Sequence, residues 1–196
     1  MRHSWLGVLL LSVHAASGAA ESERVEPSEP HAADVALAKQ LAAELKAALT
    51  EALKVSAEHA IDVCNTRAPE IAATIADEGK VTVGRTSLRV RNPANAPNAW
   101  QREVLETFQR RHADGEPLSS LEYSAVVETA DGHAERRFMK AIPTEPLCVT
   151  CHGRQLAPAL ERAIAAKYPD DAATGFDVGD VRGAVYVVRR LDDAEH

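Results

Sequence analysis

The sequence predicts an α+β domain, in which helices flank an antiparallel sheet, from three observations. Residues 34–63 carry alanines and leucines at steps of three and four, with no glycine or proline among them, which is typical of a long helix. Two later segments, 121–128 and 134–142, are strand-like instead. The turn between these segments contains Asp131 and Gly132, a pair that strongly favours a tight hairpin between antiparallel strands.

The helical part is expected to come first. The helix over 34–63 is expected to end near Cys64, because residues 65–69 include a proline and indicate a break. Pro69 suits the first turn of a second, shorter helix, since a proline there loses no helical hydrogen bond. We expect that second helix to end at about Asp77.

A strand is expected over 81–91, where the side chains alternate between two faces. One face carries a basic row formed by Arg85, Arg89 and Arg91. Residues 92–97 contain two prolines and are expected to form a loop.

The second half of the domain is expected to surround the hairpin with further helices and a last strand. The elements are a helix from Pro97 with Trp100, Val104, Leu105 and Phe108 on one face, the strands 121–128 and 134–142, a helix over 157–167 and a strand over 183–191.

Composition limits the size and the partners of the protein. The 196 residues suffice for one domain with its own apolar core. Lysine and arginine total 22 against 29 acidic residues, so the net charge is −7 with histidine neutral, and aromatic residues make up only 4%. A nucleic-acid partner is not expected, because phosphate contacts need a basic face and base stacking needs aromatic side chains.

The N-terminal segment 1–20 has the three parts of a secretory signal peptide. Arg2 and His3 give it a polar start, 6–13 is a short apolar run, and 18–20 are small residues that suit cleavage. The apolar run is too short to span a bilayer, and no later run is long enough to do so.

The rest of the chain divides into a linker, a domain and a tail. Residues 21–33 are acidic and contain prolines, so we expect a linker; 34–191 form the folded domain, and 192–196 a short tail. Export in a Gram-negative cell would place the protein in the periplasm, released from the membrane.

Three cysteines, Cys64, Cys148 and Cys151, make an odd number for a disulfide framework in an exported protein. The last two belong to the pattern Cys-x-x-Cys-His, completed by His152, which is the attachment motif for c-type haem. Two thiols three positions apart can bond to the two vinyl groups of one haem, and the histidine that follows is then held under the iron. The motif and the export signal together predict one covalent haem c.

Three alternatives compete with haem attachment. A zinc site could use all three thiols and a histidine, but the sequence lacks a second closely spaced ligand pair. A redox dithiol would need a thioredoxin-like context, which the pattern lacks. A disulfide between Cys148 and Cys151 would close a strained loop and leave His152 unexplained. We rank haem first, zinc second and the disulfide third.

The second axial ligand of the iron is left open by the residues alone. Met139 is the thioether that would remain after cleavage of the signal peptide, and core packing explains it better. Cys64 continues an apolar helical stripe, so it is either a small buried side chain or a ligand. The histidine candidates are His59, His112 and His133.

Three segments carry a family resemblance: Val63-Cys64-Asn65 followed by Ala68-Pro69-Glu70-Ile71-Ala72, the run Gly84 to Pro93 with Asn95-Ala96-Pro97, and the late Cys148-x-x-Cys151-His152-Gly153. Over roughly 35–191 the chain resembles the exported single-haem c-type domains with a PAS-like fold. The resemblance implies a PAS-like antiparallel sheet with flanking helices. It also implies that His152 and Cys64 are the axial ligands.

The function implied by the resemblance is that of a periplasmic monohaem c-type cytochrome in redox or small-gas sensing. A thiolate ligand favours ferric iron and a low potential. Reduction would weaken its bond, so that CO or NO could displace Cys64. Arg85 is the first choice of the basic row to pair with the haem propionates.

Two other functions remain as alternatives: a simple periplasmic electron carrier, and a non-haem exported module that binds zinc. An enzyme is not expected, because no nucleophile and base can be paired from the sequence. A redox partner or signalling protein is expected, and the long Ala/Leu helix could pair with a second copy.

Overall fold

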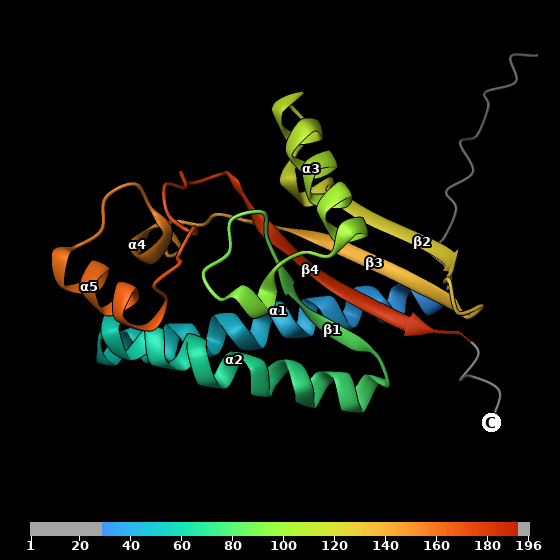
Figure 1. The fold of residues 1–196 in the computed structure, drawn as a ribbon, viewed down its shortest axis with the longest axis horizontal. Helices are drawn as coiled ribbons and strands as arrows, with labels where there is room; N and C mark the ends of the chain where they lie inside the picture. Colours follow the sequence, from blue (N-terminus) through green and yellow to red (C-terminus); the bar gives the residue numbers. More distant parts are fainter. Residues whose placement is uncertain (1–28, 192–196) are drawn as a thin grey trace, which may run out of the picture.

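The computed structural model describes residues 29–191, which form a four-stranded sheet with helices on both faces (Figure 1). The predicted signal peptide (1–20), most of the predicted linker and the predicted tail (192–196) lie outside the described residues. No helix within the described range is long and apolar enough to cross a membrane.

Two long helices, α1 (Glu29–Val55) and α2 (Ala57–Gly79), lie side by side as a helical hairpin (Figure 1). A single residue, Ser56, separates them. Its hydroxyl accepts a hydrogen bond from the His59 backbone N–H at 3.0 Å, which caps the start of α2. The capping serine therefore marks the turn, and α1 begins five residues before the predicted helix start.

The predicted break at 65–69 is wrong, and so is the predicted helix end near Cys64. Pro69 lies inside α2, where it removes one backbone hydrogen bond. The helix continues through the proline because both of its halves are buried by packing. Ile61 is buried before the proline and Ile75 after it.

The sheet confirms the α+β prediction and the predicted hairpin. Its strands run antiparallel in the order β1-β4-β3-β2, so the last strand of the chain lies between the first and the third. Their bounds are β1 (Thr82–Thr86), β2 (Glu122–Glu128), β3 (Ala134–Pro143) and β4 (Val181–Arg190).

Strand β1 is shorter than the predicted strand over 81–91, because Ser87 starts a turn. The Ser87 hydroxyl donates to the Arg182 carbonyl at 2.8 Å and accepts from the Arg89 backbone N–H at 3.2 Å. Such a bond to the residue two positions on competes with strand pairing. Arg89 and Arg91 consequently leave the sheet and lie in the loop that follows.

The core has a layer on each face of the sheet (Figure 1). The helices α1 and α2 cover one face, and α3 (Ala99–Ala113) covers the other, flanked by the short 3₁₀ helices η1 (Pro93–Asn95) and η2 (Leu118–Ser120). Buried residues of the first layer include Leu41, Ile75, Phe138 and Val187, and those of the second include Leu105, Phe108, Leu121 and Met139.

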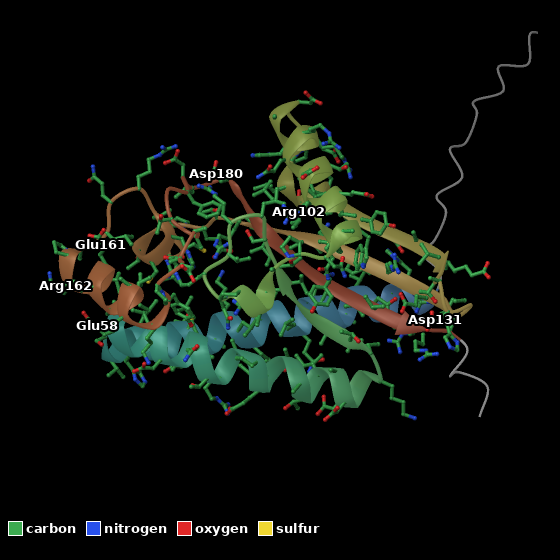
Figure 2. All side chains as sticks on the ribbon, in the orientation of Figure 1. Glu58, Arg102, Asp131, Glu161, Arg162 and Asp180 are labelled. Atoms are coloured by element: carbon green, nitrogen blue, oxygen red, sulfur yellow. The ribbon has the colours of Figure 1, made fainter. Side chains whose placement is uncertain are left out.

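Beyond one end of the sheet lies a small helical lobe, formed by α4 (Val149–His152) and α5 (Pro158–Lys167). Helix α5 was predicted, whereas the single turn of α4 was not. Charged side chains such as Glu58, Glu161 and Arg162 are exposed at this end of the molecule (Figure 2). Ile61 of α2 packs against the lobe through a buried cluster completed by Leu160, Ile164 and Tyr168.

Candidate functional site

The sequence-predicted site residues come together at two adjoining cavities of about 280 and 200 Å³ between α1, α2, the sheet and the lobe. Cys148 lines both cavities, and Cys151 and His152 line the second. Cys64, some eighty positions earlier in the chain, and Arg85 line both as well. The fold thus brings the Cys-x-x-Cys-His motif and the remaining cysteine to one continuous space.

The walls of this space differ in polarity along its length. The first cavity is lined mainly by apolar side chains of α1, α2 and β3, such as Leu45, Leu49 and Phe138. The lining of the second includes apolar side chains such as Leu53 and Ile61. Its polar lining includes Arg85, Arg91, Asn92, Asn95 and Arg182.

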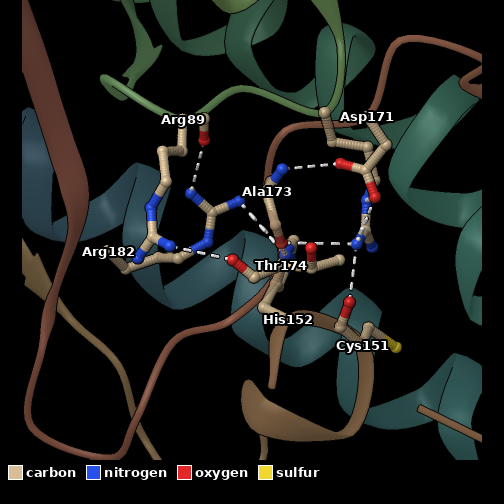
Figure 3. A network of polar contacts seen from close by, with 8 residues as sticks. Arg89, Cys151, His152, Asp171, Ala173, Thr174 and Arg182 are labelled. Carbon is tan, nitrogen blue, oxygen red and sulfur yellow. Dashed lines mark hydrogen bonds and ion pairs between the residues drawn. The ribbon is translucent and has the colours of Figure 1, made fainter. Parts of the chain in front are cut away.

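The His152 ring is held in one orientation by its neighbours (Figure 3). Its Nδ1 lies 2.6 Å from the Ala173 carbonyl oxygen. A carbonyl can only accept, so Nδ1 carries the proton and Nε2 keeps its lone pair. Phe176 packs edge-on against the ring at 6.4 Å between centroids.

Burial, and then the positive charges of Arg182 and Arg91, lower the pKa of His152 to about 2. The Arg182 guanidinium lies 3.4 Å from both ring nitrogens. A neutral imidazole whose Nε2 is unprotonated is the form that binds a metal. The surroundings of His152 therefore favour a ligand over a proton carrier.

A loop over 171–177 clamps the motif from outside, and two arginines hold this loop (Figure 3). Arg91 pairs with Asp171 at 2.9 Å and donates to the Cys151 carbonyl at 2.6 Å. Arg89 donates to the Thr174 carbonyl at 2.9 Å. These bonds fix the backbone of α4 against the loop.

The aromatic ring of Phe176 joins the same network. Arg89 lies over the ring at 3.6 Å from its centroid, and Arg182 lies 4.9 Å from it. The Phe176 backbone N–H donates to the His152 carbonyl at 2.9 Å. Sequence reasoning missed Arg182 and this loop, since contacts between positions so far apart leave no periodic signal.

The predicted basic row is split by these contacts. Arg89 and Arg91 bind backbone carbonyls, and Arg91 also binds a carboxylate. The Arg85 side chain has no hydrogen bond or ion pair to any residue in the range 29–191, and burial lowers the pKa of its guanidinium. Of the three arginines in the predicted row, Arg85 is therefore the one available to bind a ligand in the cavities.

Cys64 is half-buried, and burial raises the pKa of its thiol, while Arg85, Arg91 and Arg182 act in the opposite direction. Next to it, the Tyr168 hydroxyl donates to the Asn65 side-chain oxygen at 3.1 Å. That bond joins α2 to the lobe that carries the motif.

The other candidate ligands lie away from the cavities. Met139 is fully buried in the layer beneath α3, on the opposite face of the sheet. His59 is exposed, His112 lies near the Glu116 carbonyl, and His133 lies in the hairpin turn. Within the described part of the chain, no three His, Cys, Asp or Glu side chains are grouped to hold a metal ion.

A family model described as Tll0287-like matches residues 15–189. Among solved structures, the crystal structure of the cyanobacterial haem-protein Tll0287 is similar, with a TM-score of 0.51 and 27% sequence identity. The similarity covers 64% of this chain and 70% of that one. No curated protein matches the chain.

Proposed function

Because the chain belongs to the Tll0287-like family, whose model matches residues 15–189, we propose that it is a haem protein with one c-type haem. Cys148 and Cys151 attach the haem, and His152 and Cys64 are its axial ligands. The similarity to a haem protein supports the cofactor. The Cys-x-x-Cys-His motif supports covalent attachment.

One observation carries this proposal: both motif thiols, the histidine and Cys64 line the same space, whose walls suit a flat apolar group with a charged edge. The two thiols are three positions apart, at the cap and within the single turn of α4. The Nε2 atom of the histidine stays unprotonated because Nδ1 donates to the Ala173 carbonyl. The residues present therefore fit the cofactor.

Bound haem supplies a redox-active iron that also binds diatomic gases. The chain's own residues orient and shield it. The Ala173 carbonyl sets the tautomer and direction of His152, as hydrogen-bonded partners commonly do for metal ligands. The leucines of α1 exclude water from the apolar end of the space.

The haem propionates require positive charge and hydrogen-bond donors. Arg85, Asn92 and Asn95 line the second cavity and meet this need. Arg91 is less suited, since Asp171 and the Cys151 carbonyl already bind its guanidinium.

Redox or small-gas sensing is the role we propose for this haem. A Cys64 thiolate would stabilise ferric iron and would be held less tightly by ferrous iron, so Cys64 is the residue that would respond to reduction. A simple electron carrier would keep both axial ligands in both oxidation states. The two roles are distinguished by whether CO replaces a ligand in the reduced protein.

The cofactor is tested by expressing the chain with its own N-terminus in a bacterium that attaches c-type haem. The expected product keeps its haem colour after extraction with acidified acetone. Replacing both motif cysteines, Cys148→Ala with Cys151→Ala, should make the haem extractable. A wild-type protein without covalent haem contradicts the proposal.

The axial thiolate is tested separately with Cys64→Ala. The variant should keep the covalent haem but shift the Soret band and lose the low-spin ferric electron paramagnetic signal of a thiolate complex. Met139→Leu is the matched control, since Met139 is buried on the other face of the sheet. An unchanged spectrum in Cys64→Ala rejects thiolate ligation.

Export to the periplasm is proposed from the signal-like segment 1–20, which lies outside the described residues. Fractionation of cells that express the full chain tests it. We expect the protein in the periplasmic fraction, shortened at its N-terminus by about twenty residues.

A further inference from the structure

A third cavity, of about 370 Å³, begins at Cys64 and extends along α2 away from the motif. Its walls come mainly from α2, strand β1 and the 3₁₀ helix η1, with Leu41 and Leu45 of α1 and Tyr186 of β4. Neither motif cysteine nor His152 lines it. Within residues 29–191, Cys64 and Arg85 are the two residues that line this cavity and both cavities of the proposed haem site.

We propose that the Cys64 side chain withdraws into this third cavity when an exogenous ligand takes its place at the iron, and that Arg85 pairs with it there. The proposal rests on the axial role of Cys64 proposed above. In this proposal Arg85 is a positioning residue for the released sulfur, and the third cavity is the site that receives it.

The first support is geometric, because the move needs only a rotation of one bond. A side chain in a helix has two accessible χ1 rotamers, near 180° and −60°. Cys64 lies within α2 at the junction of all three cavities. A change of rotamer can therefore turn the sulfur from one cavity to another while the backbone of α2 stays in place.

The second support is the space available. The wall of the third cavity along α2 is built from small side chains: Ala68, Ala72, Ala73 and Ala76. A thiol group is small enough to enter without displacing them. A larger side chain at position 72 would fill this space. Ala72 is half-buried and does not line the two haem cavities.

The third support is charge. A released thiolate in a half-buried space is costly unless a cation faces it. The Arg85 side chain has no hydrogen bond or ion pair among the described residues, whereas Arg91 is held by Asp171. Arg182, the third cation near Cys64, lines the second cavity but not the third. Arg85 is thus the cation able to follow the sulfur.

The exchange itself involves no net oxidation or reduction. The iron–sulfur bond breaks with the electron pair remaining on the sulfur of Cys64. A neutral diatomic ligand such as CO donates its own electron pair to the ferrous iron. The negative charge that leaves the iron is then balanced by the Arg85 guanidinium.

The test measures CO binding to the reduced, haem-loaded protein by its visible spectrum. Arg85→Gln removes the cation, and Ala72→Leu fills the receiving cavity. Each is expected to lower the CO affinity about tenfold, within the usual range of coupling between linked groups. Arg111→Gln is the matched control, since this arginine pairs with Glu116 at the end of α3, on the other face of the sheet, and should leave the affinity unchanged.

The same two changes are then made in the Cys64→Ala protein, where no side chain needs to withdraw. There Ala72→Leu should leave the CO affinity unchanged, and Arg85→Gln, which also removes a proposed propionate partner, should lower it less than when Cys64 is present. Equal effects with and without Cys64 would overturn the proposal, as would an unchanged affinity in both single variants. If Cys64→Ala alone leaves the spectrum unaltered, the axial assignment fails instead, so the two failures are distinguishable.

A crystal structure of the reduced CO form gives a readout independent of affinity. It should place the Cys64 sulfur in the third cavity beside the Arg85 guanidinium. A sulfur that stays in either of the other two cavities contradicts the proposal. Ala72→Leu keeps the test valid even where Arg85→Gln loads haem poorly.

Discussion

Asp34 is the most sharply testable structural residue, because its carboxylate is completely buried between two arginines. It pairs with Arg136, and its second oxygen accepts from Arg189 Nε at 3.1 Å. Arg189 also donates to the Gly79 carbonyl at 2.9 Å. The carboxylate therefore ties the start of α1 and the end of α2 to strands β3 and β4.

The substitution Asp34→Asn preserves shape and removes the charge. Two guanidiniums then face a neutral amide, and Arg136 is itself buried. Breaking a buried ion pair by removing one partner costs about 3–5 kcal/mol. Because the amide oxygen still accepts one hydrogen bond, we expect a loss near the lower end, about 3 kcal/mol in the free energy of unfolding.

The assay is urea unfolding followed by circular dichroism, with urea chosen because it does not screen charges. Asp177→Asn is the matched control, since Asp177 and its partner Arg154 are 57% and 67% exposed. An exposed pair contributes at most about 1 kcal/mol. Equal losses in the two variants would refute the reasoning from burial. The visible spectrum should not change in Asp34→Asn. The Arg189 hydrogen bond to the Gly79 carbonyl lies at the end of α2 that is remote from Cys64.

Three further predictions follow from the same contacts. In haem-free protein, the free energy of unfolding should fall as the pH drops from about 6.5 toward 2. The reason is that His152 binds a proton in the unfolded chain, whereas its buried ring in the folded protein stays neutral. His152→Asn should therefore flatten this part of the pH profile of urea unfolding. Tyr168→Phe should cost about 1 kcal/mol by deleting the hydrogen bond to Asn65, and a loss near zero in urea unfolding would mean that the bond does not join α2 to the lobe. Gly183→Ala should destabilise the sheet by about 1–3 kcal/mol, because a Cβ there would lie 2.4 Å from the Thr86 carbonyl oxygen; a melting temperature equal to wild type would contradict this.

The fold class could be predicted from the sequence because local patterns carry it. The Ala/Leu stripe of α1, the Asp131-Gly132 turn and the alternation of β2 and β3 are short-range signals. The end of α1 could not be placed, because Pro69 is a stronger local signal than Ser56. Packing of both halves of α2 outweighs the helix-breaking tendency of the proline.

The site could be predicted in part for the same reason. The Cys-x-x-Cys-His motif is local, and the structure brings it to the same cavities as Cys64. The roles of Arg182 and the Ala173 carbonyl depend on a loop that returns to α4 after α5, and no periodic pattern signals such a return. Arg85 faces the cavities, whereas Arg89 and Arg91 bind backbone carbonyls, because strand β1 ends before Ser87. The hydrogen bond from the Ser87 hydroxyl to the Arg182 carbonyl sets this end, and it joins positions far apart in the sequence.

The central claim is that one haem is bound covalently at Cys148 and Cys151 and held by a thiolate from Cys64. The most direct measurement is the intact mass of the exported protein together with its ferric electron paramagnetic spectrum. The account predicts the mass of the processed chain plus one haem, with a low-spin thiolate signal that disappears in Cys64→Ala. A processed chain at its polypeptide mass, or a signal that persists without Cys64, contradicts it.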